Sequence, residues 1–130
     1  MSFGGATLMT DNVASTVDFY QRAFGLGVSF EDPDGTFVVL NYGSAAALET
    51  GVLLAVEHWD KISDYADRGP ANGFRLGFHS ADVPVAYERA IAAGAVGLLD
   101  PVYRPWKQWV AAVRDPNGAI VEIAGPTEYK

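Results

Sequence analysis

The chain has 130 residues, of which 49% are hydrophobic and 19% charged, enough for one globular domain with a buried core. Its net charge of −7 argues against nucleic-acid binding and would attract cationic small molecules, while the lack of cysteine excludes disulfides and thiolate catalysis. No apolar run reaches the roughly 20 residues of a membrane helix, and residues 1–11 lack a signal-peptide pattern. We therefore expect no membrane partner and a cytoplasmic location.

The first half of the chain predicts a β-α-β-β-β series. Apolar residues recur at spacings of four and three from Val13 to Phe24, which indicates an amphipathic helix. Asp11 and Asn12 are both helix-capping types, and we assign the cap to Asp11. Gly25 stands where a left-handed C-cap is expected. Strands are expected at 5–10, 27–31, 36–42 and 52–58, with a turn at 32–35, whereas 43–50 has no clear assignment.

The same series is predicted again after a polar, glycine- and proline-containing stretch at 61–73, which favours a linker. Asp82 caps a helix from Val83 to about Ala93, and Asp11 and Asp82 stand 71 positions apart. A repeat this long indicates two similar supersecondary units. We predict an α+β fold in which two βαβββ modules form a cupped mixed sheet with the helices outside. Module one covers about 1–60 and module two about 74–126 of a single domain, with second-module strands at 74–79, 96–99, 109–114 and 119–123 and a turn at 115–118.

Two groups of residues in this order resemble the vicinal oxygen chelate superfamily, which includes glyoxalase I, extradiol dioxygenases and bleomycin-resistance proteins. The first half carries Asp11, the run 15–20 and the run 24–26. The second half carries 74–78, Asp82, Gly94-Ala95, 115–118 and 121–123. The resemblance covers nearly the whole chain. It implies paired βαβββ modules and a homodimer.

Enzymes of that superfamily bind a divalent metal through four inward His, Gln or Glu side chains. Carried over by spacing, the resemblance places these positions at Gly4, Leu54, Arg75 and Glu122. Only Glu122 is a ligand type, and one carboxylate does not hold a catalytic metal ion. The register at Leu54 is open, so Glu57 or His58 can be the inward residue, and His79 shares the face of Arg75. A different metal site built from Glu122, His79 and His58 therefore stays open as an alternative. We predict no metal and no cofactor.

Arg75 and Glu122 occupy positions that the resemblance brings to one point, so we expect them to form an ion pair. This pair is either a polar anchor for a ligand or a purely structural salt bridge. Aromatic residues suggest the rest of a ligand cavity, because such side chains stack on planar or cationic molecules. Pro105 places Trp106 on a loop or strand edge. The candidate ligand-binding residues are Arg75, Glu122, Trp106, Trp109, Tyr103, Trp59, His58, Phe37, Tyr42 and His79.

The resulting hypothesis is a metal-independent binding protein that resembles bleomycin-resistance proteins. It would sequester a planar or cationic small molecule in an aromatic cavity, without a chemical step. A second hypothesis is a metal-dependent lyase, isomerase or dioxygenase with rearranged ligands around Glu122. A third is an interaction module without a ligand, which predicts a cavity filled by side chains.

Overall fold

The computed structural model describes residues 1, 5–42, 54–62, 64, 68 and 73–127. These residues divide into two compact units. One unit consists of Met1–Gln21 and Gly25–Gly69, and the other of Arg22–Phe24 and Pro70–Lys130. That the two modules form a single domain stays a prediction, and the unassigned stretch 43–50 lies outside the described residues.

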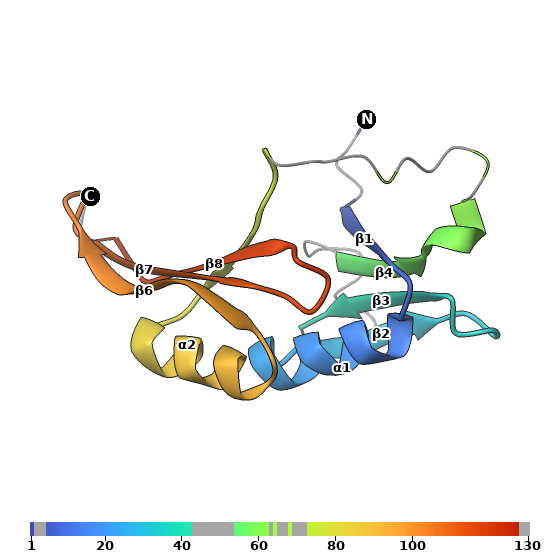
Figure 1. Ribbon diagram of the computed structural model, residues 1–130, viewed down its shortest axis with the longest axis horizontal. Coiled ribbons are helices and arrows are strands. Elements are labelled where there is room, and N and C mark those ends of the chain that lie inside the picture. Colours follow the sequence, from blue (N-terminus) through green and yellow to red (C-terminus); the bar gives the residue numbers. More distant parts are fainter. Residues whose placement is uncertain (2–4, 43–53, 63, 65–67, 69–72, 128–130) are drawn as a thin grey trace. The chain divides into compact units, whose positions relative to one another are not determined.

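The first unit is a four-stranded mixed sheet with one helix along one face (Figure 1). Its strands lie in the order β1-β4-β3-β2, in which β1 and β4 are parallel and the other neighbours antiparallel. The elements are β1 (Ala6–Thr10), α1 (Val13–Phe24), β2 (Gly27–Glu31), β3 (Phe37–Asn41), β4 (Leu54–His58) and the short 3-10 helix η2 (Trp59–Ile62).

The face of this sheet that carries α1 is identified by a hydrogen bond between two threonines. Thr16 Oγ1, on the helix, donates to Thr10 Oγ1 at 3.3 Å. Thr10 is paired in register with His58, so alternate residues of β4 share its face. Val56 and Leu40 on this face are fully buried. These apolar residues form the core of the unit.

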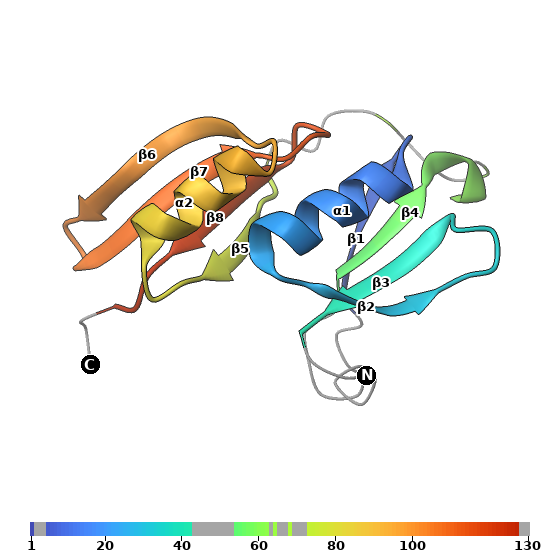
Figure 2. The ribbon, with the colours of Figure 1, turned by 90° about the horizontal axis from the view of Figure 1, so that it is seen from below.

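The second unit repeats the architecture (Figure 2). Its strand order is β5-β8-β7-β6, with β5 parallel to β8. Val121 and Ile123, and across from them Ala111 and Val113, are buried on the face that α2 covers. The elements are β5 (Leu76–His79), α2 (Val83–Ala92), β6 (Val96–Arg104), β7 (Gln108–Arg114) and β8 (Ile120–Ala124).

The predicted α+β fold with two βαβββ modules is confirmed, with two local corrections. The N-cap of α1 is Asn12, whose side chain accepts from Ser15 N, so the equivalent caps Asn12 and Asp82 stand 70 positions apart (12 and 82). The strand expected at 96–99 continues to Arg104. It tolerates Pro101 because β6 is an edge strand with irregular register at that point.

Candidate functional site

The expected ion pair between Arg75 and Glu122 is present in the second unit. Nε of Arg75 lies 3.3 Å from Oε2 of Glu122. Glu122 alternates with the buried Val121 and Ile123 along β8, so its side chain lies on the face turned away from α2. The Arg75 side chain is 62% exposed and that of Glu122 is 30% exposed. The pair therefore lies at an accessible surface and not in the core.

The residues around this pair are small. Gly77 is paired with Glu122 across β5 and β8, and a Cβ built on Gly77 meets no atom within 4 Å. On the other side of Glu122, β7 places Ala112. Open space thus lies next to a carboxylate and a guanidinium, which is an arrangement that can accept a polar group of a ligand.

His79 continues the row on the same face, two residues beyond Gly77. It lines a hollow of about 560 Å³ together with Gln108 and the segment Gly125–Thr127. Gln108 is held in place at both ends of its amide: Nε2 donates to Gly125 O at 2.8 Å, and Oε1 accepts from Trp106 Nε1 at 3.0 Å. The hollow therefore has a fixed polar wall.

Trp109 and Tyr103 lie on the opposite face of this sheet. They are paired in register on β7 and β6, and their rings meet edge to face with centroids 5.7 Å apart. Trp109 alternates with Val110 and shares its face with Ala111, which is buried under α2. Strand alternation therefore directs Arg75 and Trp109 to different faces of this sheet. Their role in ligand binding stays a prediction.

Trp106 lies in the turn between β6 and β7, as Pro105 predicts. Trp106 is 47% exposed, and the Arg104 guanidinium lies 5.7 Å from the centroid of its ring. The indole N–H is already donated to Gln108. Trp106 thus supports the wall of the hollow through Gln108.

The other predicted aromatic residues belong to the first unit. Phe37 packs near Phe30 on the face turned away from α1, with centroids 6.3 Å apart. Tyr42 is exposed at the end of β3, and Trp59, in η2, has the Arg68 guanidinium 4.8 Å from its ring centroid. Within this unit these residues do not form one aromatic wall, because they lie on different elements and faces.

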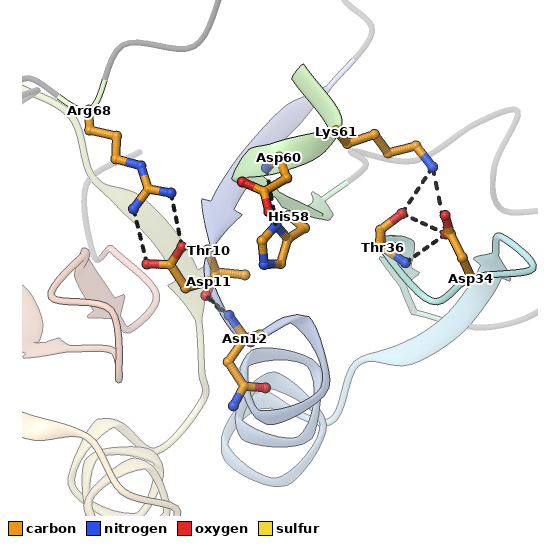
Figure 3. A network of polar contacts seen from close by, with 9 residues as sticks. All are labelled: Thr10, Asp11, Asn12, Asp34, Thr36, His58, Asp60, Lys61 and Arg68. Atoms are coloured by element: carbon orange, nitrogen blue, oxygen red, sulfur yellow. Dashed lines mark hydrogen bonds and ion pairs between the residues drawn. The ribbon is translucent and has the colours of Figure 1, made fainter. Parts of the chain in front are cut away.

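His58 is part of a polar network in the first unit (Figure 3). Its Nδ1 accepts a hydrogen bond from Asp60 N at 3.0 Å. Lys61 Nζ pairs with Asp32 and Asp34, and the Lys61 hydrogen bond holds the Asp32 pKa at about 2 instead of 3.8. Figure 3 also shows Arg68 bound through two nitrogens to the Asp11 carboxylate. His58 thus has a hydrogen-bond partner within the unit, and its role in ligand binding stays a prediction.

The residues at the superfamily's metal positions do not fit a metal ion. The caps Asn12 and Asp82 are equivalent positions of the two units, so Gly5, seven residues before Asn12, is the counterpart of Arg75. Ala55 is the counterpart of Glu122, because each is paired with the residue five positions before its cap. Leu54 faces α1, so its assignment to an inward position was one residue out of register, and Gly4 lies outside the described residues. Glycine and alanine have no side-chain atom that can bind a metal ion, and the positive charge of arginine repels one. The described residues hold no group of three His, Cys, Asp or Glu side chains able to bind one.

The profile of the glyoxalase-like domain family matches residues 3–128. The chain belongs to this family. This match and many solved structures of the glyoxalase/bleomycin resistance/dioxygenase superfamily that share the fold support the vicinal oxygen chelate superfamily that the sequence resembles. No curated protein matches the chain.

Three solved structures illustrate the shared fold. A glyoxalase/bleomycin resistance protein/dioxygenase family enzyme from Burkholderia phytofirmans is 20% identical with a TM-score of 0.76, covering 94% of this chain and 96% of its own. A glyoxalase-related enzyme from Fulvimarina pelagi is 21% identical with a TM-score of 0.78, covering 97% and 89%. TioX from Micromonospora sp. ML1 is 20% identical with a TM-score of 0.74, covering 95% and 98%. At such identities the likeness shows the fold alone.

Sequence reasoning did not single out Gln108 or Gly77. Gln108 stands directly before Trp109, and adjacent residues of a strand face opposite sides of the sheet. Gly77 stands between Arg75 and His79, and a glycine inside a strand is a signal for close approach of another group. Among the described residues, no helix has the length and apolarity needed to span a membrane.

Proposed function

We propose that this protein binds a small organic molecule without a metal ion, on the face of the β5–β8 sheet turned away from α2. The observation that carries the proposal is the Arg75–Glu122 ion pair beside the open space over Gly77. A guanidinium offers five N–H donors and a carboxylate offers acceptors, so the pair can bind both a polar and a cationic group of a planar ligand.

The exposure of the pair supports a binding role over a structural one. An ion pair with a mostly exposed arginine contributes only about 0–1 kcal/mol to folding. Because the pair holds the fold together so weakly, a ligand can take over one partner at little cost. The hollow of about 560 Å³ beside His79 and Gln108 provides room for the apolar body of the ligand. That hollow also favours a binding protein over an interaction module whose cavity is filled by side chains.

The residues at the superfamily's metal positions favour binding without chemistry. Gly5, Ala55 and Arg75 supply no metal ligand, which leaves Glu122 alone. The metal-dependent alternative built around Glu122, His79 and His58 is therefore not favoured. We propose stoichiometric sequestration of the ligand in the manner of bleomycin-resistance proteins, with a homodimer as the expected assembly.

The experiment has two parts. The metal content of untagged protein is measured by plasma mass spectrometry before and after incubation with Mn²⁺, Co²⁺, Ni²⁺ and Zn²⁺, and we expect no stoichiometric ion. Metal-free bleomycin and a panel of planar cationic compounds are then titrated by calorimetry. A stoichiometric ion that is lost in Glu122→Ala would overturn the proposal and restore the enzyme hypothesis.

A further inference from the structure

A second hollow, of about 400 Å³, lies on the other face of the same sheet, where α2 begins. Its walls come from three places: the start of the helix, the ends of β6 and β7, and the segment that follows β8. The residues that shape it are Asp82, Val83, Pro84, Tyr103, Trp109 and Pro126. It shares Ala81 and the segment 125–127 with the hollow beside His79, whereas Tyr103 and Trp109 line only this hollow.

The aromatic pair in this hollow is half exposed. Tyr103 and Trp109 are each 45% accessible although their rings contact one another edge to face. A Cβ built on Gly125 would lie 3.6 Å from Trp109 Cβ and 3.4 Å from Val83 Cγ2, so this position lies between the tryptophan and the start of α2. The rings are thus fixed on strands with accessible faces. Fixed aromatic faces attract organic cations through the ring quadrupole.

The formal charge in the hollow is negative. Asp82 is the single charged residue among those that line it. Its Oδ1 accepts from Val85 N at 3.2 Å as the cap of α2, whereas Oδ2 accepts no hydrogen bond from the described residues. The remaining side chains are mostly apolar and offer few acceptors. A primary ammonium or a guanidinium needs three to five acceptors, but a quaternary ammonium needs none.

We propose that this hollow binds a quaternary ammonium group, with its methyl groups against Tyr103 and Trp109 and its charge near Asp82 Oδ2. The net charge of −7 of the chain adds a long-range attraction for such a cation. This site lies on the opposite face from Arg75 and Glu122 and does not depend on the function proposed for that pair.

The test uses choline and its neutral isostere 3,3-dimethylbutan-1-ol, which has the same shape without the charge. The full chain, labelled with ¹⁵N, is titrated with each compound while the indole N–H resonances are recorded, and Trp109 is assigned by Trp109→Phe. We expect saturable shifts centred on Trp109 with choline and at least about fivefold weaker binding of the alcohol. Equal binding of the two compounds, or no choline binding at millimolar concentration, would overturn the proposal.

Asp82→Asn is the informative variant, because asparagine caps a helix as well as aspartate does and already caps α1 at Asn12. We expect an unchanged melting temperature and about fivefold weaker choline binding. Tyr103→Leu removes one ring and is expected to weaken choline binding about threefold. Glu88→Gln, which removes one negative charge at an exposed position of α2, serves as the control and leaves choline affinity unchanged. Unaltered affinity in Asp82→Asn would show that the carboxylate is not part of a cation site and would contradict the proposal.

Discussion

Nε of Arg75 and Oε2 of Glu122 lie 3.3 Å apart on the face of the second sheet that α2 does not cover. The two residues are 47 positions apart in the chain (75 and 122), and they meet because β5 and β8 are neighbouring parallel strands. Their meeting place corresponds to the metal positions that the superfamily resemblance implies. In this chain that place holds two opposite charges and no further ligand type among the described residues.

Arg75→Met separates the binding role of this pair from a structural one. We expect ligand binding to weaken at least about tenfold, because a charge-assisted hydrogen bond is lost, while the free energy of unfolding changes by less than about 1 kcal/mol. Calorimetric titration and urea unfolding measure the two quantities. Arg68→Met is the matched control, since it removes the same charge and an exposed ion pair with Asp11 in the other unit. Unchanged ligand affinity in Arg75→Met would leave only the structural role.

The N-cap of α1 can be assigned by paired substitutions. Asn12 Oδ1 accepts from Ser15 N at 3.0 Å, whereas Asp11 contacts Arg68 at the surface. We expect Asn12→Ala to lower the free energy of unfolding by about 1 kcal/mol and Asn12→Asp to leave it unchanged. Asp11→Ala should change it by less than about 1 kcal/mol. Urea unfolding of the three variants tests this. A larger loss in Asp11→Ala than in Asn12→Ala would restore Asp11 as the cap.

Gly97 accommodates the Tyr87 hydroxyl, which donates to Asp100 Oδ1 at 3.0 Å. A Cβ at position 97 would overlap that hydroxyl, while the ring carbon Cζ stays 3.4 Å away. We expect Gly97→Ala to destabilise the protein by about 1–2 kcal/mol in thermal or urea unfolding. In a Tyr87→Phe background the overlap is gone, so the same substitution should be close to neutral. An equal loss in both backgrounds would mean that the hydroxyl is not the cause.

Asp32 and Lys61 make part of the stability depend on pH. The Lys61 hydrogen bond lowers the Asp32 pKa from 3.8 to about 2, and the backbone N–H of Phe37 also lowers it. Because the folded-state pKa lies below the unfolded value, this contribution is present above about pH 3.8 and is lost as the pH falls toward 2. We expect Lys61→Met to move the Asp32 pKa toward 3.8 in an NMR titration of the carboxyl carbon.

The corresponding stability curve supplies the control. Between pH 4 and 2, the free energy of unfolding of Lys61→Met should depend less on pH than that of the unmodified chain, because methionine does not stabilise the Asp32 carboxylate. Arg89→Met, which changes the same charge at another exposed site, should keep the steeper dependence. If the Asp32 pKa stays near 2 in Lys61→Met, the backbone hydrogen bond and not the lysine controls it.

The elements that the sequence predicts best are those with local causes. The helix predicted from Val13 to Phe24 has those bounds, because its apolar period and the left-handed Gly25 depend only on neighbouring residues. The Arg75–Glu122 pair was also predictable, since the family resemblance supplies both positions. By contrast, the cap of α1 is Asn12 and not the predicted Asp11, a difference of one residue. The residue of β4 that faces away from α1 at the superfamily's metal position is likewise Ala55 and not the predicted Leu54.

The sequence by itself determined the α+β class and the repeated series of elements, because these follow from composition and periodicity. The tertiary structure alone decided which side chains share a face. Trp109 lies with Tyr103 beside the start of α2, and Gln108 lies with His79 on the other face. Strand pairing and register are long-range relationships, and shifting a strand by one residue exchanges its two faces, so no local pattern of residues can specify them.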